Sequence, residues 1–314
     1  IVYLDGGMGT LLQAQGLTPG EHPEKWNVSH PEIITDIHKN YFNSGSNVVC
    51  TNTFGANSLK FNDTELEEII KSAISNAKKA RELSETTHEK FIALDIGPTG
   101  KLLKPLGDLD FNDAVNIFSK TVSLGVKYGV DLVLIETMND SYETKAALLA
   151  VKENCDLPVL VSNAYNEDGK LMTGATPSAM VALLEGMGAT AIGANCSLGP
   201  KQLTKVAEEL LKNASIPVIL KPNAGLPEII DGKTIPESFE ISAEESTAID
   251  DEILEKVREN FTFEYPFEKL AGIQSKASVS LLANKAESEK YTFTSKPSFM
   301  SEGGVSATER GTAM

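Results

Sequence analysis

The sequence predicts an α/β protein folded as a (β/α)8 barrel. Short apolar segments typical of strands alternate with amphipathic helical segments, in units of roughly 30 to 45 residues. Regular alternation of this kind implies parallel strands joined by right-handed helical crossovers. The 314 residues leave room for one such barrel, whose eight units typically total about 250 residues.

Seven segments have strand character, so seven βα units are evident. They are residues 1–5, 47–54, 91–96, 130–136, 159–164, 191–194 and 218–221. Helical patterns separate them, beginning at Leu11 and then covering residues 33–41, 66–83, 111–128, 142–154, 177–187 and 203–212. No eighth apolar strand with a polar end follows, so we expect the eighth strand to be missing or replaced.

Polar residues close almost every predicted strand. In a barrel the carboxyl ends of all strands surround one mouth, whereas a doubly wound open sheet concentrates its functional groups at one switch point. The distribution over many strand ends therefore favours the barrel. These residues are Asp5, Asn52, Asp95, Glu136, Asn163, Asn195 and Asn223.

Composition excludes several classes of function. A formal net charge of −16 argues against a nucleic-acid or anionic-membrane surface. No apolar run approaches the roughly 20 residues that cross a bilayer, so we expect no membrane association. The three cysteines, Cys50, Cys155 and Cys196, form no C-x-x-C pair, which favours a reducing, cytoplasmic compartment.

Two stretches place candidate ligand-binding residues at the predicted mouth of the barrel. Gly6-Gly7 lies between a strand and a helix, where glycines let the backbone approach a ligand, although the spacing does not match a phosphate loop. Cys196 follows the sixth strand and offers a soft metal ligand, but a lone cysteine is more often a small buried hydrophobe. Asn52 and Asp95 either belong to this site or satisfy strand-end amides.

The mouth residues lie in motifs that resemble the homocysteine S-methyltransferase family, which includes the homocysteine-binding domain of cobalamin-dependent methionine synthase. The resemblance covers residues 1 to about 234, and six motifs follow the family order. They are Leu4-Asp5-Gly6-Gly7-Met8-Gly9-Thr10, Thr51-Asn52-Thr53-Phe54, Asp95-Ile96-Gly97-Pro98-Thr99-Gly100, Ile135-Glu136-Thr137, Asn195-Cys196-Ser197-Leu198-Gly199-Pro200 and Pro222-Asn223-Ala224-Gly225.

The resemblance implies a zinc ion held by three cysteine thiolates, with the homocysteine sulfur as a fourth ligand. Zinc matters because a free thiol is only a few per cent ionised at pH 7. Cys196 is then both the catalytic residue and the first metal ligand. The resemblance allows methylcobalamin or methylfolate, presented by other domains, as the methyl donor, but the sequence does not distinguish them from betaine or S-methylmethionine. The residues assigned to substrate binding are Asp5, Gly6, Gly7, Glu136, Asn195 and Asn223.

The chain departs from the family at the other two zinc ligands. The family supplies them from a Gly-Gly-Cys-Cys-Gly run, whereas this sequence has Gly303-Gly304-Val305-Ser306. Cys155 is predicted on the opposite face of the barrel, and Cys50 lies inside its strand. We therefore expect an impaired methyltransferase, with a non-catalytic barrel remnant that binds a small amino acid as the alternative.

The last part of the chain has a different character. From about residue 252 it resembles a fragment of the helicase/nuclease of bacterial double-strand-break repair, which suggests a chimeric or misassembled chain. Residues 1–234 are thus predicted as an incomplete barrel, and 235–314 as an unrelated, poorly ordered tail that does not close it. A nucleic-acid enzyme is not favoured, because the sequence has no helicase P-loop.

Overall fold

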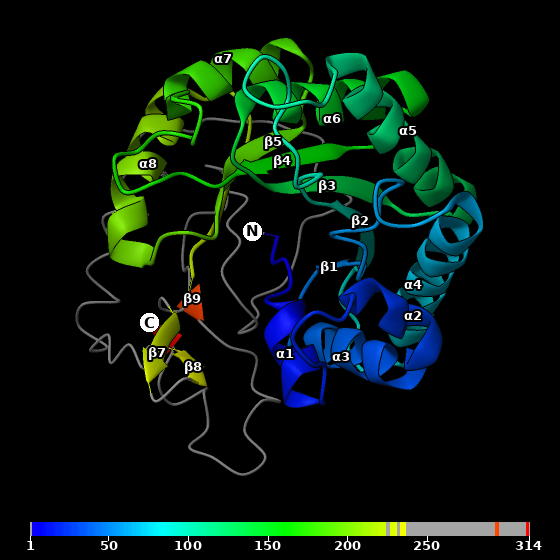
Figure 1. Cartoon of the computed structure of the whole chain (residues 1–314). Coiled ribbons are helices and arrows are strands. Elements are labelled where there is room, and N and C mark those ends of the chain that lie inside the picture. Colours follow the sequence, from blue (N-terminus) through cyan, green and yellow to red (C-terminus); the bar gives the residue numbers. More distant parts are fainter. Residues whose placement is uncertain (1, 224–226, 231–232, 237–292, 295–311, 314) are drawn as a thin grey trace.

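A parallel sheet that curls around a central axis organises the protein. The computed structural model describes residues 2–223, 227–230, 233–236, 293–294 and 312–313. Its six-stranded sheet has the order β1-β2-β3-β4-β5-β6, and all neighbouring strands pair in parallel. The helices lie along the outside of the curl (Figure 1). This arrangement is the predicted barrel architecture over the first part of the chain.

The strands of the sheet are β1 (Val48–Cys50), β2 (Phe91–Ile96), β3 (Leu132–Met138), β4 (Val159–Asn163), β5 (Ala191–Asn195) and β6 (Val218–Lys221). The helices are α1 (Met8–Ala14), α2 (Trp26–Ser29), α3 (Pro31–Asn43), α4 (Asp63–Leu83), α5 (Phe111–Tyr128), α6 (Ser141–Asn154), α7 (Pro177–Gly186) and α8 (Pro200–Asn213), with a short 3-10 helix at Pro23–Lys25. Each predicted helix is present within a few residues of its expected bounds.

The first predicted strand, residues 1–5, differs from the expectation. It contacts the sheet through one parallel bridge, between Leu4 and Val48, and so is not a full strand. Two hydrogen bonds make up this bridge: the backbone amide of Val48 donates to the carbonyl oxygen of Tyr3 at 3.0 Å, and that of Asp5 donates to the carbonyl oxygen of Val48 at 2.9 Å. The segment nevertheless lies next to β1, and it therefore brings Asp5 to the predicted edge of the sheet.

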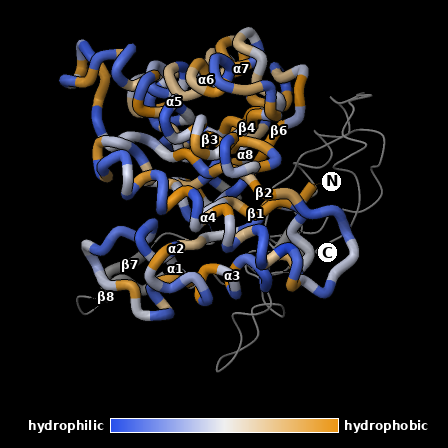
Figure 2. The backbone as a smooth tube through the Cα atoms, turned by 90° about the vertical axis from the view of Figure 1, so that its right-hand side faces the viewer, coloured by the Kyte–Doolittle hydropathy of each residue, from blue (hydrophilic) through white to orange (hydrophobic). Residues whose placement is uncertain are grey.

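Alternation along each strand divides the core in two. Leu132, Leu134 and Leu160 belong to a small cluster inside the curl, whereas Val133 and Val161 belong to the large cluster between the sheet and the helices. Both faces of the sheet are thus covered by apolar groups, as parallel sheets require. Figure 2 shows that strands such as β4 and β6 are predominantly hydrophobic.

Side-chain caps fix where several helices begin. Asn62 forms a capping box with Glu65 at the start of α4, and its side chain accepts from the amides of Thr64 and Glu65 at 3.1 Å. Asp110 and Asp140 cap α5 and α6. Caps of this type satisfy amides that a helix leaves unpaired, so each crossover has a defined start above the sheet.

Within the described residues the parallel sheet ends at β6. Strands β7 (Pro227–Ile230) and β8 (Lys233–Pro236) form an antiparallel pair of their own, and β9 (Phe293–Thr294) pairs with β10 (Thr312–Ala313). The rest of the predicted tail, including the strand-like residues 278–282, lies outside the described residues. No described helix is both long enough and apolar enough to cross a membrane.

The close approach of β5 and β6 gives a test of the register. A Cβ atom at Gly193 would collide with the backbone carbonyl oxygen of Ile219, so Gly193→Ala must displace one strand. We expect a loss of about 1–3 kcal/mol in the free energy of unfolding, measured by urea denaturation.

Gly186→Ala is the matched control, because a Cβ there meets no atom within 4 Å. We expect the control to be neutral or slightly stabilising, as alanine is the better helix former. Equal effects of the two substitutions would show that the β5–β6 register is wrong.

Candidate functional site

The inner face of the curled sheet carries polar side chains at its carboxyl-terminal end. On each strand the residue two positions after an inward apolar residue also points inward, because side chains alternate with a period of two. This register places a ring of polar and thiol groups above the inner apolar cluster. The ring consists of Cys50, Asp95, Glu136, Ser162, Asn195 and Lys221.

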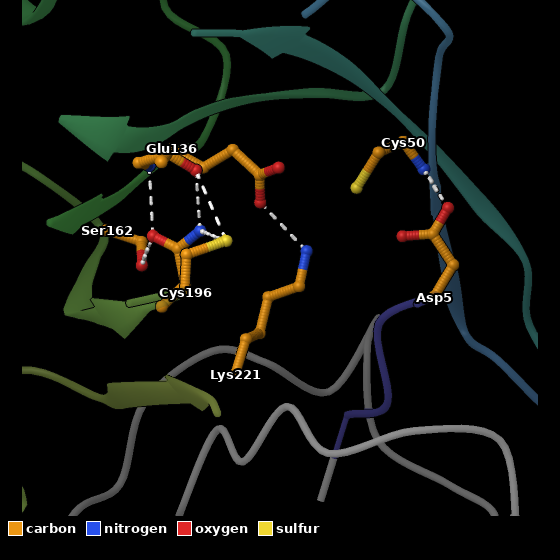
Figure 3. Close-up of polar contacts among 8 residues, drawn as sticks. Asp5, Cys50, Glu136, Ser162, Cys196 and Lys221 are labelled. Carbon is orange, nitrogen blue, oxygen red and sulfur yellow. Dashed lines mark hydrogen bonds and ion pairs between the residues drawn. The ribbon is translucent and has the colours of Figure 1, made fainter. Parts of the chain in front are cut away.

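An ion pair crosses this ring. The Lys221 Nζ atom lies 2.8 Å from Glu136 Oε2, and each side chain is 15% exposed. Strands β3 and β6 are not neighbours in the sheet, so the pair spans the interior of the curl. Figure 3 shows the Lys221 side chain reaching from β6 toward Glu136.

Asp5 lies on the opposite side of Lys221 from Glu136 (Figure 3). One carboxylate oxygen, Oδ2, accepts from the backbone amide of Cys50 at 2.7 Å, while the buried Oδ1 has no hydrogen-bond partner. Burial raises the pKa of Asp5 from 3.8 to about 6, although the positive charge of Lys221 opposes this shift. Asp5 therefore has an oxygen free for a further donor.

Asp95 is a second buried carboxyl group at this end of the sheet. Burial, and after it the negative charge of Glu136, raises its pKa well above the usual value, while Lys221 acts in the opposite direction. Its Oδ1 atom also lacks a partner. Of the two interpretations left open for Asp95, the structure thus favours a place in the ring.

Asn195 connects three strands through its side chain. Its Oδ1 accepts from the backbone amide of Thr137 at 2.9 Å and from the hydroxyl of Ser162 at 2.7 Å. Its Nδ2 donates to Thr137 Oγ1 at 2.7 Å and to Cys196 Sγ at 3.5 Å. The amide is therefore held in one orientation, directed at the thiol of Cys196.

Cys196 lies in a strained turn directly after β5. Cys196, Ser197 and Thr137 have φ angles of 57°, 58° and 60°, in the left-handed region that non-glycine residues rarely adopt. The amide of Cys196 donates to the carbonyl oxygen of Lys221 at 3.1 Å. Burial raises the pKa of the Cys196 thiol, and the charge of Glu136 adds to this.

The remaining predicted substrate residues lie around the same end of the sheet. Gly6 and Gly7 follow Asp5, and the carbonyl oxygen of Gly7 accepts from the hydroxyl of Tyr41 at 3.3 Å. Gly7 has a φ of −68°, so its backbone conformation does not itself require glycine. The half-buried Asn223 follows β6, and its backbone amide donates to the carbonyl oxygen of Leu198 at 2.9 Å.

Two other strand-end residues tie loops together. Asn52 Nδ2 donates to the carbonyl oxygen of Pro23 at 2.8 Å, which supports its structural interpretation. Asn163 Nδ2 donates to the carbonyl oxygen of Met138 and to Thr144 Oγ1. Neither donation reaches the ring.

A zinc site of the predicted kind is not formed by the described residues. They contain no group of three or more His, Cys, Asp or Glu side chains that could hold a metal ion. All three cysteines and all four histidines of the sequence fall within residues 2–223. Cys155 lies at the end of α6, and its thiol contacts the carbonyl oxygen of Val151, away from the ring.

Comparison with known proteins identifies the chain's family. A family model described as "Homocysteine S-methyltransferase" matches residues 2–283, which is most of the chain. The chain belongs to the homocysteine S-methyltransferase family. It is 31% identical over 239 residues to the methionine synthase of Mycobacterium leprae, and 30% identical over 240 residues to that of Mycobacterium tuberculosis. Each match covers 71% of this chain but only 20% of the relative.

Solved structures of a homocysteine methyltransferase share the fold. The metallated form of MmuM from Escherichia coli has a TM-score of 0.64 and 22% identity, covering 72% of this chain and 84% of that one. Its oxidized form has a TM-score of 0.66 and 21% identity, covering 82% and 87%. These similarities confirm the predicted barrel-type α/β fold.

The family match extends beyond the predicted junction. It continues to residue 283, past the boundary near residue 234 at which the sequence changes character. The resemblance of the tail to a helicase/nuclease and the division into residues 1–234 and 235–314 stay predictions.

Sequence reasoning missed several residues of the ring, and Thr137 next to it. Lys221, Ser162 and Thr137 carry contacts to predicted site residues, and Cys50 lies beside Asp5 although it was placed inside its strand. The signal was present in the alternation pattern, because Lys221 lies two positions after the inward Ile219. The prediction rested on the polar residues that close a strand, and so overlooked the inward register.

The buried carboxyl group of Asp5 predicts a pH-dependent stability. Its pKa is higher in the folded chain than its ordinary value of 3.8, so its contribution is greatest below pH 3.8 and is lost as the pH rises through about 6. Asp5→Asn keeps an oxygen for the Cys50 amide and removes this loss. Between pH 4 and 7 we expect the free energy of unfolding of the variant to fall by up to about 3 kcal/mol less than that of the wild type.

The measurement is urea denaturation across that range, with the exposed Asp156→Asn as control. The control should follow the wild-type profile. If Asp5→Asn follows it as well, Asp5 is not a buried group with a raised pKa.

Proposed function

We propose that this chain is the homocysteine-binding module of a larger methionine synthase-like protein, with homocysteine bound at the carboxyl-terminal end of the curled sheet. Membership of the family supports the reaction class. The module proposal is supported by the short share, about a fifth, of the methionine synthases that the chain spans.

The observation that carries the proposal is the meeting of Asp5, Glu136 and Cys196 at one end of the sheet. The charges of Glu136 and Asp5 act on each other, and Glu136 also acts on the Cys196 thiol. Homocysteine has the ammonium group of an α-amino acid at one end and its sulfur at the end of the side chain. The carboxylates would bind the ammonium group, and the sulfur would lie toward Cys196.

The remaining assignments extend this arrangement. Asn223 would contact the amino-acid end, and Gly6-Gly7 would line the pocket beside Asp5. Asn195 would orient Cys196 by its hydrogen bond to the thiol. In the reaction itself, the homocysteine sulfur forms a bond to the methyl carbon, the bond between methyl group and donor breaks, and the thiol proton leaves.

Zinc would ionise both Cys196 and homocysteine if the family's three thiolates were present. The described residues supply one of these ligands and do not fit the full set. The sequence beyond residue 223 contains neither cysteine nor histidine. We therefore propose that methyl transfer by this chain is impaired, because the sulfur stays largely protonated at pH 7.

A second candidate is a non-catalytic barrel that binds a small amino acid. The incomplete ligand set at Cys196 favours it, since the ion pair and Asp5 require no metal for binding. Both candidates place the ligand in the same mouth. They differ in whether a completed metal site restores transfer.

The methyl donor, methylcobalamin or methylfolate, would come from other domains, which serve as the chain's partners together with homocysteine. A reducing, cytoplasmic compartment is part of the proposal, because Cys50, Cys155 and Cys196 are all free thiols. No nucleic-acid partner is proposed.

Completing the metal site separates the two candidates. We expect the chain to retain less than one equivalent of zinc after dialysis, and to methylate homocysteine negligibly. Replacing the segment after residue 234 with a family segment that contains the Gly-Gly-Cys-Cys-Gly run should restore zinc binding and transfer. Elemental analysis and methionine formation are the two measurements.

In the restored chain, Cys196→Ser should abolish zinc binding and transfer, whereas Cys155→Ser should preserve both. Stoichiometric zinc in the unaltered chain would contradict the impairment. A restored chain that binds zinc but makes no methionine would favour the non-catalytic candidate.

A further inference from the structure

Lys221 gives the mouth a charge that its other groups lack. Among the described side chains whose charges act on Asp5 and Asp95, it is the cation, and the others are carboxylates or thiols. Burial lowers the pKa of Lys221, but Glu136, Cys50 and Asp5 together raise it well above the usual value. Lys221 is therefore positively charged at neutral pH.

The ion pair between Lys221 and Glu136 is short and only partly buried. An ammonium group and a carboxylate lie 2.8 Å apart, with 15% of each side chain still exposed. A buried ion pair rarely adds stability over a well-packed apolar pair, because both charges must be desolvated. Stability alone thus gives no reason for this pair at the mouth, whereas ligand recognition does.

An α-amino acid carries the complementary pair of charges. Its ammonium and carboxylate groups are attached to one carbon, so two adjacent protein groups of opposite charge can each meet its counterpart. The unpartnered Oδ1 of Asp5 provides a further acceptor on the other side of Lys221. In the structure Lys221 and Glu136 satisfy each other's charges, and a bound amino acid would replace this pairing with its own.

We propose that Lys221 determines specificity by binding the carboxylate of the amino-acid substrate, while Glu136 and Asp5 share its ammonium group. The inference rests on the proposed function. It makes a free α-carboxylate a requirement for tight binding. In the opposite role, the Lys221 ammonium group would compete with that of the ligand for Glu136 and Asp5. Removing Lys221 would then tighten the binding of homocysteine.

Calorimetric titration of the full chain under reducing conditions tests the assignment with two ligands. L-homocysteine carries the carboxylate, and 3-aminopropane-1-thiol is the same molecule without it. The wild type should bind homocysteine roughly 10- to 100-fold more tightly, the effect of a hydrogen bond to a charged group. Lys221→Met should weaken the binding of homocysteine by that factor. It should leave the binding of the aminothiol unchanged or make it tighter.

Lys221→Arg should restore part of the affinity for homocysteine, because it keeps the positive charge. Lys120→Met, which removes an exposed lysine paired with Asp63, should change neither affinity. Thermal unfolding checks that each variant is folded. If Lys221→Met does not fold, equal wild-type affinities for the two ligands still overturn the inference, and Lys221→Arg still tests the residue.

Three results would overturn the inference while leaving the proposed function intact. They are equal wild-type affinities for the two ligands, equal weakening of both by Lys221→Met, and tighter binding of homocysteine by that variant. A wild type that binds neither ligand would overturn the proposed function, and the inference with it.

Discussion

The structure depends on parallel pairing of strands in chain order. Because every strand runs in the same direction, each one ends at the same edge, and the period-two alternation decides which side chains point inward there. One apolar layer, including Leu134 and Ile219, fills the curl below. The polar ring above it is thus a consequence of register, and a shift by one residue on any strand would remove a member.

Gathering these groups has an electrostatic consequence. Asp5, Asp95 and Glu136 lie close enough for their charges to interact in a buried setting, which is unfavourable for three ionised carboxylates. Below about pH 6 the raised pKa values of Asp5 and Asp95 relieve part of the repulsion by keeping protons bound. Lys221 relieves another part by pairing with Glu136. The mouth is therefore suited to a ligand with an ammonium group.

Backbone strain concentrates next to this ring. Thr137 and Cys196 both adopt positive φ angles, and the side chain of Asn195 bonds to each of them. Such conformations persist where surrounding contacts hold them, and they are common at functional sites. The hydrogen bonds of Asn195 supply those contacts, so the thiol of Cys196 is directed by a network that spans β3, β4 and β5.

Much of this fold follows from sequence patterns, and the site follows from them in part. Helical spacing located α4 and α5 closely, and polar residues after apolar runs pointed to Glu136 and Asn195. The first strand was overpredicted, because its β-prone residues form a single bridge to the sheet, between Leu4 and Val48. The alternation pattern contains the inward register of Lys221, but its ion pair with Glu136 on a non-adjacent strand depends on the curl of the sheet, which no local pattern contains.

The most direct test of the account is a crystal structure of the chain with L-homocysteine. The account predicts the ligand at the carboxyl-terminal end of the sheet, with its ammonium group beside Glu136 and Asp5 and its sulfur toward Cys196. Homocysteine bound elsewhere, or bound in the mouth with its sulfur directed away from Cys196, would contradict the account.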